Sequence, residues 1–231
     1  MPPVLPEDWY LAGDSVWNSG GKRCFDIAAA FLGLCLLLPA LLLIAVVIQL
    51  VDGAPVLYSE TRLGRSGKPF LILKFRTLRS GSDREPRIAP EDDPRITRCG
   101  RWLRRWRLDE FPQLINVLRG DMSLVGPRPL PASHADGVSE HTLELLLSVR
   151  PGLTDPAAIF FLAEDAVLVG HPEAEKIYFE RFFPLKIRMA TEAAAETSFV
   201  GDLTMLLRTL ARLWSPRARR RSAQALRKLL Q

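Results

Sequence analysis

The sequence predicts an α+β protein in which a long apolar helix near the N-terminus precedes a mostly helical domain with one small β-hairpin. Three observations predict this class. Residues 27–50 carry no charge, extended segments flank a turn at 63–68, and amphipathic patterns recur at 95–107, 140–149 and 198–214. An apolar run of this length suits a membrane helix, and Gly and Ser between strand-forming residues are typical of a hairpin turn. The amphipathic patterns indicate helices with one face on the domain or at a membrane interface.

Composition limits the size and the compartment. With 231 residues, 48% of them hydrophobic, the chain is large enough for one core domain and an appendage. The net charge of +5 is concentrated in arginine clusters, which suit a phosphate-rich small molecule, an anionic membrane surface or nucleic acid. The three cysteines form no CxxC pair, which indicates a reducing compartment, and the three histidines form no zinc-ligand pattern.

The lead-in of residues 1–21 is rich in Pro, Gly and small polar side chains. Its aromatic residues Trp9, Tyr10 and Trp17 could rest at a membrane interface, where amphipathic rings are favoured, or pack on the domain. Both interpretations stay open.

The uncharged run from Ile27 to Leu50 would form roughly 36 Å of helix, enough to cross a hydrocarbon core about 30 Å thick. A spanning helix is the default interpretation; a signal peptide fits poorly because the run starts late, is too long and lacks a clear cleavage site. Two features favour a re-entrant helix. Pro39 lies in the middle of the run, where proline bends a helix. Basic residues flank the run on both sides, which by the positive-inside rule places both ends on the cytoplasmic side.

Residues 55–77 predict the two strands of the hairpin, and Lys74 and Arg76 alternate with Phe75 on the second strand. Side chains two positions apart point to one face of a strand, so both cations are expected on the same side. A solvated strand edge guarded by lysine is the alternative to a binding role.

The polar, Pro-rich segment 79–94 predicts a mobile loop, and an exposed acidic loop explains Asp92 and Asp93 better than a metal site does. The helix expected at 95–107 carries arginines along one face. These cations could face anionic lipid headgroups, while Arg104 binds a pyrophosphate from another face.

Two adjacent carboxylates, Asp109 and Glu110, follow six arginines in thirteen residues. Neighbouring helical residues point about 100° apart, so one acid can meet an electrophile while the other binds a metal or moves a proton. Pro112 indicates a helix start or break at the pair, where free backbone N–H groups favour anions. The plain alternative is that both acids only neutralise neighbouring arginines on a solvated surface.

After the acid pair, residues 113–118 continue a helix that a glycine ends, and a rigid turn follows from Asp121 to Pro131. Arg128 stands in this turn between Pro127 and Pro129. Stiff flanks lower the entropy that is lost when an arginine closes on a phosphate, and the planar guanidinium suits bidentate contact.

From Asp109 to Pro129 the sequence DEFPQLINVLRGDMSLVGPRP resembles the signature of the bacterial sugar transferase family, the monotopic phosphoglycosyl transferases. The resemblance implies a short member of this family with a re-entrant helix that turns at Pro39, although Leu38 stands where the family often has Ser. We divide the chain as follows: 1–21 lead-in, 22–52 re-entrant membrane helix, 53–214 cytosolic catalytic domain, 215–231 basic amphipathic tail.

The resemblance also implies a reaction. A sugar 1-phosphate would move from a UDP-sugar to a polyprenol phosphate, UMP would leave, and Asp109 would carry the phosphosugar as a covalent intermediate. Asp109 and Glu110 would hold Mg²⁺, with Glu110 positioning the metal or the acceptor. The expected substrate-binding residues are Lys74, Arg76, Arg104, Pro127, Arg128 and Pro129.

The implied setting is the cytoplasmic face of the bacterial inner membrane, at the first membrane step of glycoconjugate synthesis. Anionic lipid is an expected partner, a homodimer is possible, and nucleic acid is not expected. Of two later segments, one departs from the family's pattern and the other matches it. Asp155 and Pro156 depart from its Pro-Gly-Ile-Thr-Gly pattern, which leaves the loop geometry and the preferred donor open, while Tyr178, Pro184 and Lys186 match its closing segment.

Two other classes of function compete with the transferase. A non-catalytic membrane adaptor would use the arginines to dock anionic lipid or a partner, and a nucleic-acid-binding protein would use them on phosphates. Neither the transferred sugar nor the pathway can be inferred from a signature that handles phosphates.

Overall fold

The computed structural model describes residues 20–79, 81–82, 89–195 and 198–231. The aromatic residues of the lead-in lie outside this part of the chain. The helices are α1 (Lys22–Val51), α2 (Arg98–Trp106), α3 (Gln113–Arg119), α4 (Ala132–Ala135), α5 (Glu140–Ser148), α6 (Pro156–Phe160), α7 (Glu164–Val167), α8 (Ala174–Ile177), α9 (Phe183–Ala195), α10 (Phe199–Leu213) and α11 (Pro216–Leu230). The strands are β1 (Leu57–Leu63), β2 (Pro69–Phe75), β3 (Ser123–Val125) and β4 (Gly152–Thr154). Short 3₁₀ helices occupy Arg65–Gly67 (η3) and Leu108–Glu110 (η4), and a π-helix (η5) occupies Tyr178–Phe182. The α+β class is therefore confirmed.

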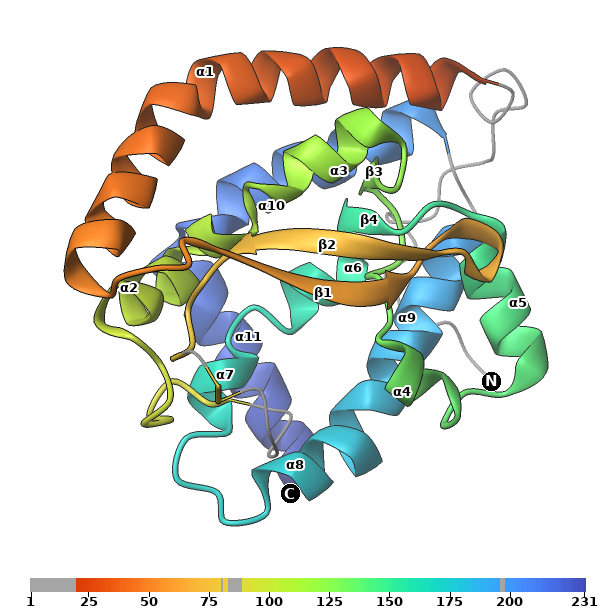
Figure 1. Ribbon diagram of the computed structural model, residues 1–231. Coiled ribbons are helices and arrows are strands. Elements are labelled where there is room, and N and C mark those ends of the chain that lie inside the picture. The colour runs from red at the N-terminus through yellow and green to blue at the C-terminus, as the bar shows by residue number, and fades with distance from the viewer. Residues whose placement is uncertain (1–19, 80, 83–88, 196–197) are drawn as a thin grey trace.

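Helix α1 is a single element of 30 residues with Pro39 inside it. Figure 1 shows that it runs along one edge of the molecule and then bends down a second edge. Among the described residues, α1 is the one helix that is both long enough and apolar enough to cross a membrane. Its outer face consists of large apolar side chains in the open, such as Leu36 at 72% and Leu50 at 79% exposure. Water does not favour such a face, so α1 requires an apolar environment along most of its length.

The inner face of α1 is attached to the domain. Arg23 donates hydrogen bonds to the carbonyls of Val117 (2.6 Å) and Leu118 (2.9 Å), which are among the last carbonyls of α3. Asp26 accepts one from the backbone N–H of Leu124 (2.9 Å). Ile48, at the other end, is fully buried. Both arms of the bent helix are thus fixed to the domain that follows.

The hairpin has the predicted strands. β1 and β2 pair in antiparallel register from Leu57 opposite Phe75 to Leu63 opposite Pro69. The turn between them contains Ser66 with a φ of 58°. Small residues suit this left-handed conformation, which explains the Gly- and Ser-containing turn seen in the sequence.

A second, parallel strand pair was not predicted, because the segment from Asp121 to Pro131 was expected to be a turn throughout. Here β3 pairs with β4, with Ser123 opposite Gly152 and Val125 opposite Thr154. The chain can approach this closely just beyond β3 because a glycine lies on each side. A Cβ on Gly152 would lie 2.1 Å from the backbone nitrogen of Gly126. Pairing across such a gap in sequence leaves no local pattern to read.

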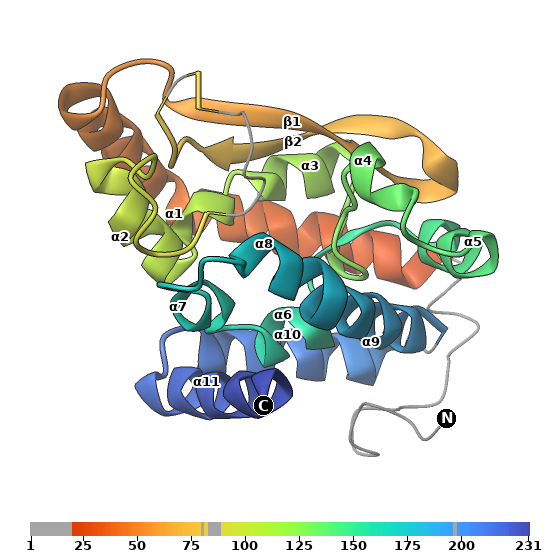
Figure 2. The ribbon, with the colours of Figure 1, turned by 90° about the horizontal axis from the view of Figure 1, so that it is seen from below.

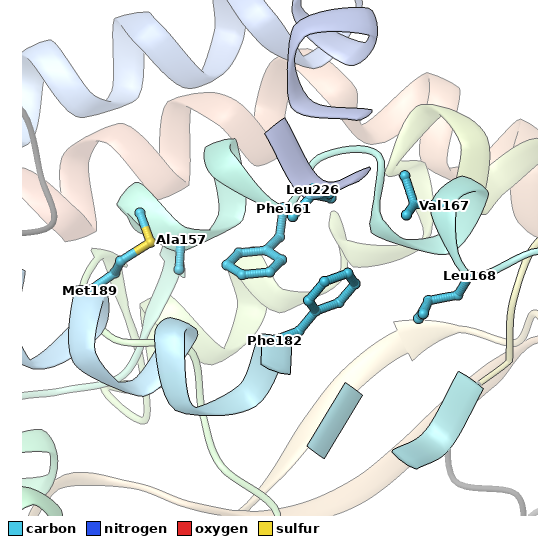
Figure 3. Close-up of a cluster of buried hydrophobic side chains, with 7 residues drawn as sticks. All are labelled: Ala157, Phe161, Val167, Leu168, Phe182, Met189 and Leu226. Carbon is cyan, nitrogen blue, oxygen red and sulfur yellow. The ribbon is translucent and has the colours of Figure 1, made fainter. Parts of the chain in front are cut away.

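Figure 2 shows the β-hairpin and the helices α10 and α11 on opposite sides of the molecule. The predicted amphipathic helices at 140–149 and 198–214 are confirmed as α5 and α10. The basic tail also forms a helix, α11, and Leu226 from it is fully buried. Figure 3 shows this residue in a cluster with side chains from α6, α7, η5 and α9: Ala157, Phe161, Val167, Leu168, Phe182 and Met189. The tail therefore completes a core and is packed against the domain.

Candidate active site

The acid pair lies in a break between two helices, as Pro112 predicted. Helix α2 is capped by Arg107 in the left-handed conformation (φ 56°, ψ 23°), which turns the chain out of the helix. The 3₁₀ turn η4 then carries Asp109 and Glu110, and Pro112 caps the start of α3. A non-glycine residue in this conformation costs about 1 kcal/mol, a strain that is common at functional sites.

Asp109 is buried, at 8% exposure, and its Oδ1 has no hydrogen-bond partner in the part of the chain that the structure describes. Burial raises the pKa of its carboxyl group, and the adjacent Glu110 raises it further. Lys74 and Arg107 oppose both effects by favouring the charged form. Asp109 therefore has one uncommitted carboxyl oxygen, and the nearby cations limit the rise in its pKa.

Glu110 differs from its neighbour because it is paired with cations. Its carboxylate accepts hydrogen bonds from Lys74 Nζ (3.2 Å) and from both terminal nitrogens of Arg128, with Nη1 at 3.3 Å. Arg107 Nη1 lies 4.0 Å away. Burial alone would raise the pKa of Glu110, but Arg128, Lys74 and Arg107 together hold it well below its usual value. The alternative that the acids only neutralise neighbouring arginines thus describes Glu110 in part, although Glu110 is buried rather than solvated.

Lys74 reaches Glu110 from near the end of strand β2. Burial lowers the pKa of this amine, while the charge of Glu110 opposes the shift. Strand β2 is held in place by Asn116 of α3, a fully buried side chain. Asn116 accepts a hydrogen bond from Leu73 N–H (3.0 Å) and donates one to the carbonyl of Leu71 (2.8 Å). This amide fixes the distance between the lysine on β2 and the acid pair that precedes α3.

Arg128 is presented by a stiff segment at the end of β3. Pro127 is fixed by its carbonyl, which accepts a hydrogen bond from Gly152 N–H (2.8 Å). Pro129 is fixed in the same way by Arg62 Nη1 (3.3 Å). The Arg128 side chain itself remains 42% exposed, so its fork can change partners without unfolding the turn. The phosphate-binding role expected of Arg128 from the sequence stays a prediction.

The structure gives the two other candidate arginines different surroundings. Arg104 faces the acid pair's cavity, where Nη2 donates to the carbonyl of Ala89 (2.5 Å) and lies 3.5 Å from Asp165. Arg76 is buried, at 6% exposure. Its guanidinium donates to three carbonyls in the connection that follows α1: Asp52 (2.7 Å), Gly53 (2.6 Å) and Ala54 (2.8 Å). Lys74 and Arg76, expected on one face of the strand, therefore have different partners: Arg76 anchors α1, although both residues line the same cavity.

One cavity of about 820 Å³ brings these groups together. The acid pair and the cations Lys74, Arg104 and Arg128 line one part of it. A second part is lined by residues that the sequence interpretation did not place in the site: Arg62, Asp155, Phe161, Glu164, Tyr178 and Lys186. A cation-rich cavity with one unpaired carboxylate oxygen suits a phosphorylated ligand.

Magnesium fits this site only together with a phosphorylated ligand. No group of three or more His, Cys, Asp and Glu side chains that could hold a metal occurs in the described ranges. Asp109 offers a free oxygen, whereas both oxygens of Glu110 already contact cations. Since Mg²⁺ is often held by one or two carboxylates and by substrate phosphates, two acids are sufficient when a pyrophosphate supplies the other ligands.

Sequence reasoning missed Asn116 and Asp155 as parts of the site. Asn116 lies inside the signature, but its contacts run to a strand more than forty residues earlier, which no local pattern reveals. Asp155 was noticed only as a departure from a family pattern. An aspartate directly before a proline, as Asp155 is before Pro156, is typical of a helix start and accounts for its role as the cap of α6. This local signal does not indicate that Asp155 lines the cavity.

Comparison with known proteins shows which family this chain resembles. A sequence model described as "Bacterial sugar transferase" matches residues 17–216. The chain is 47% identical over 142 residues to the UDP-glucose:undecaprenyl-phosphate glucose-1-phosphate transferase of Caulobacter vibrioides. The aligned segment covers 60% of the chain and 53% of that relative. It is 34% identical over 205 residues to the exopolysaccharide production protein ExoY of Rhizobium meliloti, covering 82% of the chain and 83% of the relative.

A third relative, the undecaprenyl-phosphate glucose phosphotransferase of Komagataeibacter xylinus, is 44% identical over 152 residues, which are 63% of the chain and 29% of that protein. The chain thus spans about half of the Caulobacter relative and less than a third of the Komagataeibacter one.

Proposed function

We propose, because this chain belongs to the bacterial sugar transferase family, that it moves a sugar 1-phosphate from a UDP-sugar to undecaprenyl phosphate and releases UMP. The names of the two transferase relatives supply the acceptor, undecaprenyl phosphate, and in one case a UDP-linked donor. The observation that carries the proposal is the asymmetric acid pair. Asp109 keeps an oxygen free in a cavity lined by cations, while Glu110 is held by Lys74 and Arg128.

Asp109 is the proposed nucleophile. One of its oxygens attacks the β-phosphorus of the donor, the bond from this phosphorus to the bridging oxygen breaks, and UMP leaves with the bonding electrons. An oxygen of undecaprenyl phosphate then attacks the same phosphorus and frees the Asp109 carboxylate. The product is undecaprenyl diphosphate sugar, and the enzyme returns to its starting state.

The surrounding cations offset the charge of the reacting phosphates. Arg128, exposed at its fork, can turn from Glu110 to a phosphate oxygen, and Lys74 and Arg104 line the same cavity. Such prearranged charges are often worth several kcal/mol at a transition state. Mg²⁺ held by Asp109 and Glu110 would neutralise the pyrophosphate and favour departure of UMP. Arg76 contributes indirectly in this proposal, by holding the end of α1.

We place the enzyme at the cytoplasmic face of the bacterial inner membrane, with α1 re-entering on the side from which it came. The bend in α1, the proline inside it and its exposed apolar face support this topology. Helix α10 adds a second apolar surface, with Leu207 58% and Leu210 54% exposed. A lipid-linked acceptor and a water-soluble donor would meet at such an interface. The product would prime a glycoconjugate, as the name of the ExoY relative suggests.

The test is nucleotide release from a panel of UDP-sugars with undecaprenyl phosphate and Mg²⁺. Wild type should release UMP from at least one donor, and Asp109→Asn should not. Asp136→Asn, which changes an exposed aspartate after α4, is the matched control and should behave as wild type. Intact-mass analysis should find a phosphosugar adduct on wild type alone. Release of UDP, or undiminished release by Asp109→Asn, would refute the proposal and indicate ordinary glycosyl transfer.

A further inference from the structure

The cavity extends past the acid pair to a third carboxyl group, Asp155, which comes directly after strand β4. Because β3 and β4 are parallel, the segments that follow them leave the sheet side by side. Gly126 N–H donates to the carbonyl of Thr154 (3.0 Å), and Gly152 N–H donates to that of Pro127 (2.8 Å). Arg128 and Asp155, 27 positions apart in sequence, are therefore brought to the same end of this strand pair.

One oxygen of Asp155 has a clear structural task. Oδ1 accepts a hydrogen bond from Ala158 N–H (2.7 Å) and so caps helix α6. Oδ2 is buried, in a residue with 2% exposure, and has no hydrogen-bond partner among the residues that the structure describes. A serine would cap the helix equally well. Since buried polar atoms without partners are rare in native folds, the second oxygen requires another explanation.

The surroundings of Asp155 suit a neutral, hydroxylated ligand. Burial raises the pKa of the Asp155 carboxyl group, while the backbone N–H of Ala158 and the charge and backbone N–H of Arg128 oppose this shift. Lys186 also lines the cavity, but it forms an ion pair with Glu164, and its amine lies 4.9 Å and 4.6 Å from the ring centres of Phe161 and Tyr178. This lysine is committed, and a carboxylate repels a phosphate. A hydroxyl group that donates a hydrogen bond fits the free oxygen better.

We infer that Asp155 Oδ2 accepts a hydrogen bond from a hydroxyl group on the sugar ring of the donor, and that this contact helps to select the sugar. The inference rests on the proposed function. With the β-phosphate between Asp109 and Arg128, the sugar bonded to that phosphate must lie next to it, and Asp155 is the carboxyl group beyond Arg128. A site built to bind a hydroxyl group discriminates strongly against a ligand that lacks it.

Binding of UDP and of the UDP-sugar separates this role from the alternatives. Dissociation constants would be measured by calorimetry for wild type, Asp155→Asn and Asp155→Ser in lipid nanodiscs, with UDP and with the donor that gives the most UMP, or with UDP-glucose if none does. Asn and Ser both keep a cap for α6, but neither offers the second carboxylate oxygen. We expect about ten- to hundred-fold weaker binding of the UDP-sugar, the range for a hydrogen bond to a charged group, and unchanged binding of UDP.

Each other outcome has a definite meaning. Equal weakening of UDP and UDP-sugar would show that Asp155 acts on the phosphates through Arg128, and no change in either would reduce it to a helix cap; both results overturn the inference. If wild type binds neither nucleotide, the proposed function itself fails. Asp136→Asn should match wild type with both ligands. Thermal denaturation checks that the Asp155 variants are folded.

Deoxy analogues of the UDP-sugar then identify the hydroxyl. For the analogue that lacks the contacted hydroxyl, wild type and Asp155→Asn should bind with the same affinity, because the hydrogen bond is already absent. For each of the other analogues the ten- to hundred-fold difference should persist. A difference that persists for every analogue would place the effect outside the sugar hydroxyls and overturn the inference.

Discussion

Arg128 donates to both carboxylate oxygens of Glu110, with Nη1 at 3.3 Å from Oε2 and Nη2 in closer contact with Oε1. This fork, together with Lys74, keeps Glu110 charged in a buried position. Asp109, one residue earlier, receives no such bond to Oδ1. Two adjacent acids thus have opposite pKa shifts, which is the arrangement expected where neighbouring carboxyl groups have different chemical roles.

The first prediction concerns the stability of this pair. Glu110→Gln should lower the free energy of unfolding by about 3 kcal/mol, because Lys74 and Arg128 would lose the charge that compensates them in a buried site. Urea denaturation in detergent measures the change. The control Glu173→Gln removes an exposed partner of Lys176 and should change stability by about 0.5 kcal/mol or less. Equal stability of Glu110→Gln and wild type would contradict the role assigned to the fork.

The second prediction concerns the pH dependence of stability. Because the pKa of Asp109 is raised in the folded protein, folding loses stability as pH increases through the window from its ordinary value of about 4 up to the raised value. Asp109→Asn abolishes this loss. Melting temperatures measured from pH 4 to pH 8 should therefore show the variant gaining on wild type as pH rises, while Asp136→Asn follows wild type throughout. A constant difference across that range would show that the pKa of Asp109 is unshifted.

The third prediction concerns catalysis and Lys74. This amine favours the charged form of Asp109, so Lys74→Met should raise the pKa of Asp109 further. If Asp109 must be ionised to attack, the acidic limb of the pH–rate profile of UMP release should move to higher pH. The control Lys68→Met changes an exposed lysine in the turn of the same hairpin and should leave the limb in place. A lower rate with an unmoved limb would mean that Lys74 binds the donor without tuning the nucleophile.

The fourth prediction concerns Asn116. Its replacement by Ala would leave the N–H of Leu73 and the carbonyl of Leu71 without their partner, at a cost of about 1–3 kcal/mol for each group. Urea denaturation should show a loss of stability in this range. Asn116→Asp keeps the acceptor for Leu73, but it should lose the bonds to the Leu71 carbonyl and to Asp121 Oδ2 (3.2 Å) and place two carboxyl groups together. Wild-type stability in Asn116→Ala would show that water replaces the amide.

The fifth prediction concerns the topology of α1. Pro39→Leu restores the missing backbone hydrogen bond and removes the ring that bends the helix, which should favour a straight, spanning segment. Membrane-impermeant thiol reagents applied to cysteines placed before and after α1, in a background without the native cysteines, should label both from the cytoplasmic side in the parent. In Pro39→Leu the two cysteines should be labelled from opposite sides of the membrane. Labelling from opposite sides in the parent itself would exclude a re-entrant helix.

Local patterns in the sequence determined most of the secondary structure around the site. The apolar run predicted α1, a glycine and serine turn between strand formers predicted the hairpin, and Pro112 predicted the helix break that holds Asp109 and Glu110. Each of these signals acts over a few residues, through backbone geometry or through the period of apolar side chains. The sequence also indicated which residue types gather at the site, since acids, arginines and prolines stand close together along the chain.

Tertiary structure decided which partner each of these groups has. It paired Lys74 and Arg128 with Glu110, left one oxygen of Asp109 without a partner, and bound Arg76 to the carbonyls after α1. It also paired β3 with β4 and so brought Asp155 to the substrate cavity. Such pairings join segments separated by 18 to 45 residues, and their energies depend on burial and distance in the folded state. The order of residues supplied the chemical groups, and packing selected their partners because only the folded chain excludes water from these charges.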